Sequence, residues 1–140
     1  MNLLGIGVPN MVRFIHDAAI RQQNPKIINV VFYKTPVGKE PIREWMLKLG
    51  KDDRYTIGVD LKTVEFGWPL GMPLVRSMKN YDQLWEVRSR ISGNRIARLL
   101  FTVHDSRMVL LHGFIKKTQK SPKSDLDLAD DRKREVNKGN

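Results

Sequence analysis

The chain has 140 residues, enough for one domain with a single compact core. It has no cysteine and no apolar run near the ~18 residues that cross a bilayer, which excludes disulfides, thiolate metal sites and a transmembrane helix and indicates a cytoplasmic protein. Its 25 Lys and Arg against 15 Asp and Glu give a net charge of +10, which favours nucleic acid over an acidic protein as the partner.

The chain begins with a segment that we expect to be an extension, residues 1–28, ahead of a domain over residues 29–140. A short helix is expected in the extension, ended by Asn24 and Pro25. Residues 27–33 are β-branched and aromatic, which predicts a strand.

Two helices are predicted next. Pro41 suits a first helical turn and Gly50 a stop, with Trp45 on the apolar stripe between them, where it is expected to be core. Asp52 or Asp53 is then expected to cap a helix that ends at Gly67. Residues 68–75 contain two prolines and a glycine, which predicts a loop.

Three strands and a helix complete the domain. Residues 84–91 alternate between apolar and polar, a turn at 92–94 predicts a hairpin with residues 95–103, and the apolar run 108–114 predicts a covered central strand. Ser124 and Asp127 form a capping-box pattern at the start of a C-terminal helix with a thin apolar stripe. Helices gathered against a mostly antiparallel sheet predict an α+β domain.

Cations are concentrated on the predicted hairpin and after the last strand. Four arginines lie on neighbouring strands, and lysines follow: Arg88, Arg90, Arg95, Arg98, Lys116, Lys117 and Lys120. Such a face can hold a phosphodiester, although a solvated strand face is the alternative. Arg95 and Arg98 are three residues apart, so strand geometry predicts opposite faces unless a bulge intervenes.

Histidine is the other candidate for chemistry. His112 is expected on the same side of its strand as Phe114, where it either transfers protons or belongs to the core. The three histidines lack a metal-binding spacing and no Gly-rich phosphate loop is present, so no cofactor is expected. RNA cleavage without a metal needs a base for the 2′-hydroxyl, cations for the phosphate and a proton for the leaving 5′-oxygen.

Two segments carry a family resemblance: residues 84–88 (LWEVR) and residues 110–122 (LLHGFIKKTQKSP). Over about residues 29–135 the chain resembles the phage-derived HigB-like branch of the RelE/ParE toxin superfamily. The resemblance implies a RelE-like fold: a small, mostly antiparallel sheet with two N-terminal helices packed on it and a C-terminal helix. It also implies the toxin of a type II toxin–antitoxin system that cleaves mRNA on the ribosome and inhibits translation, paired with a helix-turn-helix, HigA-like antitoxin.

The resemblance also implies which residues are catalytic and which contact RNA. The catalytic residues are expected to be Arg95, Arg88, His112, Lys116 and Lys117, and the RNA contacts Arg90, Arg98, Lys120 and Lys123. The general base stays open between His112 and the less favoured His104 and Asp105, and no tyrosine lies beyond Tyr81. Alternatives are a ParE-like gyrase inhibitor, a non-catalytic nucleic-acid-binding module and an inactive toxin that keeps antitoxin binding. The C-terminal helix is a hypothetical antitoxin contact.

Overall fold

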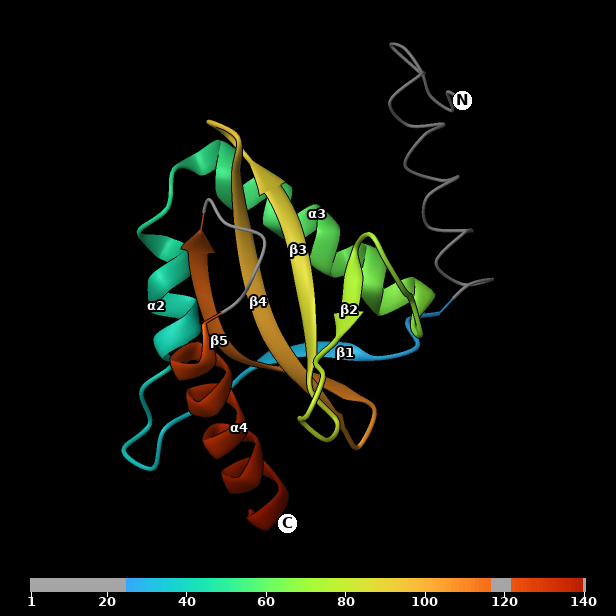
Figure 1. The fold of residues 1–140 in the computed structure, drawn as a ribbon, viewed down its shortest axis with the longest axis vertical. Coiled ribbons are helices and arrows are strands. Elements are labelled where there is room, and N and C mark those ends of the chain that lie inside the picture. The colour runs from blue at the N-terminus through green and yellow to red at the C-terminus, as the bar shows by residue number, and fades with distance from the viewer. Residues whose placement is uncertain (1–24, 117–121, 140) are drawn as a thin grey trace, which may run out of the picture.

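The computed structural model describes residues 25–116 and 122–139 and has an α+β architecture (Figure 1). Its elements in chain order are β1 Asn29–Phe32, α2 Pro41–Leu47, α3 Lys51–Gly67, β2 Val75–Ser77, β3 Trp85–Ile91, β4 Arg95–His104, β5 Arg107–Lys116 and α4 Lys123–Lys138. The α+β class is therefore confirmed. Residues 1–24, which make up most of the expected extension, lie outside the described residues, whereas Ile28 is buried in the core.

The five strands form one sheet in the order β1-β5-β4-β3-β2. β1 runs parallel to β5, and the other neighbours are antiparallel. The loop predicted over residues 68–75 was wrong at its end, because Val75 starts β2 and pairs with Val87. A strand of three residues directly after two prolines is too short to show a period of two.

One face of the sheet is covered by α2 and α3, and we call it the core face. Ile57, Leu61 and Val64 of α3 are buried as their spacing predicts, together with Val87 and Leu99 of the strands. Trp45 of α2 is part of this core, as predicted. It lies so close to Gly113 of β5 that a Cβ atom there would come within 2.7 Å of the indole ring.

The helix α4 covers part of the opposite face, so the helices are not all gathered on one side as expected (Figure 1). Its contacts combine hydrogen bonds with a thin apolar stripe. Tyr33 donates a hydrogen bond of 2.8 Å to Glu135, and Arg132 donates one of 2.8 Å to the carbonyl of Leu111. Ala129 is fully buried in the thin apolar stripe.

The predicted helix caps were wrong. α3 begins after Gly50, which provides no side-chain cap, and Asp53 instead bonds the turn that follows β3. α4 begins after Pro122 with no capping hydrogen bond from a side chain. A tertiary contact therefore places Asp53, whereas Asp127 bonds both Tyr81 and Lys123 of its own helix.

A bulge in β5 changes which face its side chains reach. Leu100 of β4 is opposite His112, whereas Phe101 is opposite Leu110, so Leu111 is the extra residue. Beyond the bulge, His112 and Phe114 point to the face that α4 partly covers. Before it, Leu110 points into the core.

The outer edge of β1 is covered at Val30 by the side chain of Glu65. This carboxylate accepts a hydrogen bond of 2.8 Å from the amide of Val30 and lies 3.2 Å from Lys26. Across the part of the chain that the structure describes, no helix combines the length and the apolar character needed to cross a membrane.

Candidate nucleic-acid interface

Four strands align cations with a histidine on the face opposite the core face. Arg76, Glu86, Leu100 and His112 form one row across β2, β3, β4 and β5. The next row holds Arg88, Arg98 and Phe114, and the third holds Arg90, Ile96 and Lys116. We call this surface, made of Arg76, Arg88, Arg90, His112 and Lys116, the basic face.

A buried ion pair forms the floor of the basic face. Arg98 and Glu86 are both fully buried and lie 2.9 Å apart. Arg88 lies 4.0 Å from Glu86, and its side chain is 14% exposed. Burial, followed by the charge of Arg98, lowers the pKa of the Arg88 guanidinium. Arg98, expected to contact RNA, is thus inside the protein and presents no surface to a ligand.

A histidine–aspartate pair lies beside these cations. Nε2 of His112 is 2.7 Å from Oδ1 of Asp125, which belongs to the first turn of α4. The ring of His112 stacks on Phe114 with centroids 5.6 Å apart, and the imidazole keeps an 18% exposed fraction. This geometry holds the ring in one orientation while leaving it accessible.

Arg95 is not brought to the basic face. It is paired with Asp53 of α3 at 2.8 Å and donates to the carbonyl of Ser92, on the core side of the sheet. Hydrogen bonds from Ser92 and the charge of Arg95 lower the pKa of Asp53. The prediction that Arg95 and Arg98 face opposite ways is confirmed, because no bulge separates them in β4.

The lysines after β5 are placed only in part. Lys116 is half-buried at the end of β5, and Lys123 is exposed at the start of α4. Lys117 and Lys120 lie in residues 117–121, outside the described residues. Asp125 and Arg76 are site residues that the sequence analysis missed. Asp125 carried a weak signal as an acidic residue beside the expected start of α4.

A groove of about 650 Å³ adjoins the basic face between the β2–β3 connection and the first turn of α4. Its side chains are Arg76, Met78, Lys79, Asn80, Tyr81, Lys123, Leu126 and Asp127. Asp127 accepts a hydrogen bond of 2.6 Å from the Tyr81 hydroxyl and one of 2.7 Å from Lys123. The groove therefore combines apolar walls, fixed polar atoms and cations.

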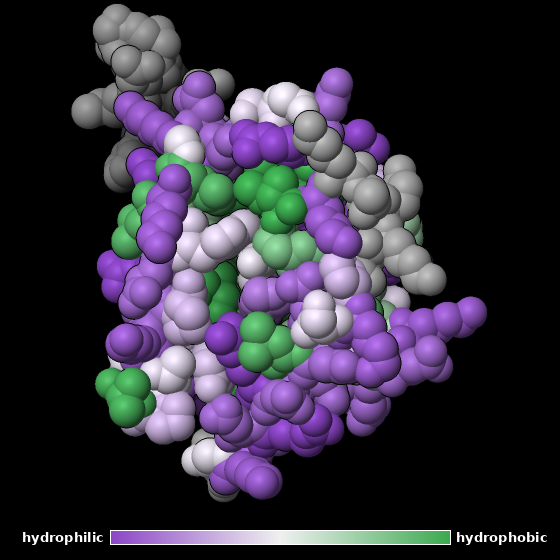
Figure 2. Space-filling model, turned by 60° about the vertical axis from the view of Figure 1, so that its left-hand side comes forward, coloured by the Kyte–Doolittle hydropathy of each residue, from purple (hydrophilic) through white to green (hydrophobic). Residues whose placement is uncertain are grey.

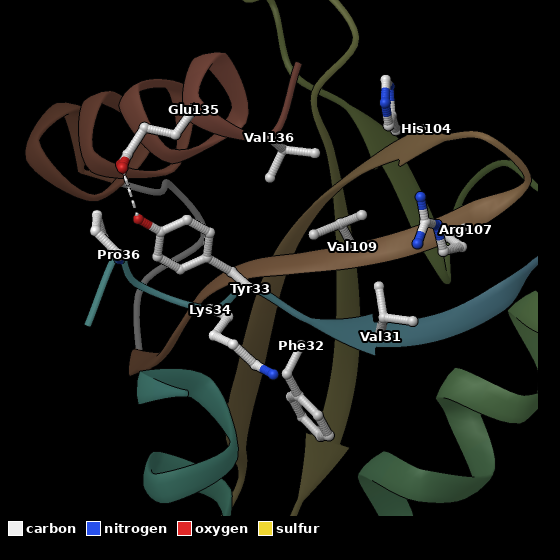
Figure 3. A pocket seen from close by; sticks show the side chains of 10 residues that line it. All are labelled: Val31, Phe32, Tyr33, Lys34, Pro36, His104, Arg107, Val109, Glu135 and Val136. Atoms are coloured by element: carbon white, nitrogen blue, oxygen red, sulfur yellow. Dashed lines mark hydrogen bonds between the residues drawn. The ribbon is translucent and has the colours of Figure 1, made fainter. Parts of the chain in front are cut away.

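A second hollow, of about 310 Å³, lies beside the C-terminal half of α4 at β1 (Figure 3). Figure 3 shows Tyr33 directed toward Glu135 of α4, while Phe32 points away from it. His104 lines this hollow at the end of β4, four residues along the strand from Leu100, the partner of His112. His104 is therefore about 13 Å from the row of His112, at ~3.3 Å per residue, and Asp105 follows it in the turn after β4.

The surface beside α2 carries apolar patches on a mostly polar background. Figure 2, which brings that side forward, shows a mostly hydrophilic surface with apolar side chains gathered in its upper part and in a central hollow. Among the residues that the structure describes, no three His, Asp or Glu side chains are grouped so as to hold a metal ion.

The comparison with family models gives one match. Residues 44–134 match the model described as "Phage derived protein Gp49-like (DUF891)", which covers more than half of the chain. The chain belongs to the Gp49-like family. The match runs from α2 into α4 and so includes every described element that contributes to the basic face and its groove.

The Gp49-like family is a RelE/HigB-like toxin family of type II toxin–antitoxin systems. Membership agrees with the resemblance found in the sequence and implies an antitoxin partner. No significant match to the chain is found among curated proteins.

Proposed function

We propose that this Gp49-like toxin is an endoribonuclease that cuts mRNA on the ribosome without a metal ion and thereby inhibits translation. The observation that carries the proposal is the placement of the His112–Asp125 pair among cations from three strands on one sheet face. Metal-free cleavage of RNA needs this combination of a proton-transfer group and preorganised positive charge.

His112 is the proposed general base. Asp125 engages Nε2, so Nδ1 is the ring nitrogen that can take the proton of the 2′-hydroxyl. The 2′-oxygen then attacks the phosphorus, the bond to the 5′-oxygen breaks, and a 2′,3′-cyclic phosphate forms. Water supplies the proton that the leaving 5′-oxygen takes up, and the protonated His112 returns its proton to the solvent.

The cations stabilise the charge that develops on the phosphate. Arg88 is held beside the buried Glu86–Arg98 pair, which fixes its position before RNA binds. Arg90 and Lys116 are at the two ends of the adjacent row, so they flank a phosphate bound over Ile96. Lys117 is proposed as a further catalytic cation and Lys120 as a further RNA contact, as the resemblance implies.

The test adds purified protein to a translating extract and maps message ends by primer extension, with and without ribosomes. We expect discrete, ribosome-dependent cuts, and a loss of about 10²–10⁴-fold in cleavage for His112→Gln. Arg43→Gln is the matched control, because Arg43 is an exposed residue of α2 that pairs with Glu40. It should cut like the wild type.

Arg95→Gln tests the catalytic role that the resemblance implies for Arg95, which lies away from the basic face in the structure. If Arg95 stabilises the phosphate, its loss will match that of Arg88→Gln. We expect a much smaller loss, because Arg95 faces Asp53 of α3.

Other outcomes would replace the proposal. Intact messages from a protein that still arrests growth would favour a ParE-like action on gyrase. RNA that is bound but not cut would indicate a non-catalytic module. For the partner, we propose a helix-turn-helix, HigA-like antitoxin, and co-purification of the toxin with the product of its neighbouring reading frame tests this.

A further inference from the structure

We propose that the groove between the β2–β3 connection and α4 holds one nucleobase of the RNA and selects bases that carry an exocyclic amino group. This inference rests on the proposed function and adds to it a site that determines where the message is cut. The groove volume of about 650 Å³ is within the range of sites that hold small organic groups.

The groove and the proposed catalytic pair lie at opposite ends of one row of the sheet, three strand spacings or roughly 14 Å apart. Arg76 lines the groove and also begins the row that ends at His112. Asp125, which binds His112, and Asp127, which lines the groove, lie in the same turn of α4. An RNA strand with its scissile phosphate at His112 therefore passes the groove with a nearby nucleotide.

The walls suit the flat face of a base. The ring of Tyr81 is fixed by the hydrogen bond from its hydroxyl to Asp127, and Met78 and Leu126 add apolar surface. Aromatic rings stack on all four bases, so this surface provides affinity without selection. Lys79 and Lys123 are exposed on the rim, where they can neutralise the flanking phosphates.

Selection comes from Asp127. Its hydrogen bonds with Lys123 and then Tyr81 lower the pKa of this carboxyl, so it is ionised and only accepts hydrogen bonds. A carboxylate has about four lone-pair sites, which leaves acceptor capacity beyond these two donors. Adenine, cytosine and guanine each offer an exocyclic amino donor. Uracil has no amino group, and its N3–H lies between two carbonyl oxygens that a carboxylate repels.

The experiment maps cut sites across many messages for the wild type and three variants in the translating extract. Wild-type cuts should be depleted of uracil at one fixed position by about tenfold. Asp127→Asn keeps an acceptor for Tyr81 but adds a donor, so it should remove most of this depletion. Tyr81→Leu should weaken cleavage at all sites. Tyr81→Phe keeps the ring and loses only the hydroxyl bond to Asp127, so it should weaken cleavage less than Tyr81→Leu.

The outcomes separate the two proposals. If wild-type cuts show no bias against uracil, or if Asp127→Asn cuts with an unchanged bias, the groove does not select the base and the endonuclease proposal stands. If Tyr81→Phe loses as much cleavage as Tyr81→Leu, the hydroxyl anchors α4 and the ring is not a stacking surface. If the wild type cuts no message, the endonuclease proposal fails, and this inference fails with it.

Discussion

The two faces of the sheet are covered in different ways. α2 and α3 close the core face through apolar side chains such as Ile57 and Val64, which are fully buried. α4 is held on the other face by a thin apolar stripe around the buried Ala129 and by hydrogen bonds from Tyr33, Tyr81 and Arg132. Apolar burial stabilises without direction, whereas hydrogen bonds fix positions. The polar contacts of α4 therefore also place Asp125 and Asp127 where chemistry is proposed.

Neighbouring residues of one strand serve both faces. Leu99 is buried in the core, and Arg98 beside it is buried against Glu86 on the opposite side. A sheet whose second face is only partly covered can thus keep an ion pair under a charged surface. Three substitutions test how much these differently covered faces contribute to the stability of the protein.

The largest effect is expected for Arg98→Met. The substitution leaves the Glu86 carboxylate buried without its 2.9 Å partner, which costs about 3–5 kcal/mol of unfolding free energy. Chemical denaturation of the purified protein measures this loss. The double variant Glu86→Gln/Arg98→Met should recover part of it, because the buried carboxylate is gone while Arg88 loses its 4.0 Å partner. A single variant within 1 kcal/mol of the wild type would show that the pair does not organise the basic face.

A smaller loss, about 1–3 kcal/mol, is expected for Gly113→Ala on the core face. The added Cβ would lie 2.7 Å from the ring of Trp45, so the helix α2 must shift away from β5. Thermal unfolding measures the change. In Trp45→Leu the same substitution should cost much less, and strictly additive losses in this double-mutant cycle would contradict the close packing.

The smallest effect is expected at Asp53, and it depends on pH. The pKa of Asp53 is lowered in the folded protein by hydrogen bonds from Ser92 and by Arg95, so its stabilisation is present above its unfolded pKa of about 3.9 and is lost as the pH falls through the folded value. Asp53→Asn should therefore lower the melting temperature at pH 7 and converge with the wild type at strongly acidic pH. If the melting temperatures of the variant and the wild type differ by the same amount at every pH, ionisation of Asp53 does not stabilise the fold.

Much of the fold was predictable because its patterns are local. The spacing of Ile57, Leu61 and Val64 predicts the buried side of α3, and the alternation in residues 84–91 predicts β3. The position of α4 was not predictable, since a thin stripe does not say which sheet face it covers. The same limit applies to the capping residues, because Asp53 forms its bonds with a turn 39 residues away.

The site was predictable only where strand geometry determines it. The shared face of His112 and Phe114 was predicted and is confirmed by their stacked rings. Asp125 was not assigned to the site, because its contact with His112 depends on how α4 docks. Arg88 and Arg98 have equal charge in the sequence, and only the structure distinguishes the buried cation from the partly exposed one.

The cover that Glu65 provides at the β1 edge affects the tendency of the toxin to aggregate at high concentration. Outward-facing amides of an edge strand are templates on which another chain can form a sheet, and this is a common start of aggregation. Glu65 occupies the amide of Val30 and is paired with Lys26, so an ion pair covers this point of the edge. A second copy that approaches strand to strand must displace this carboxylate, so the fold resists self-association before its antitoxin binds.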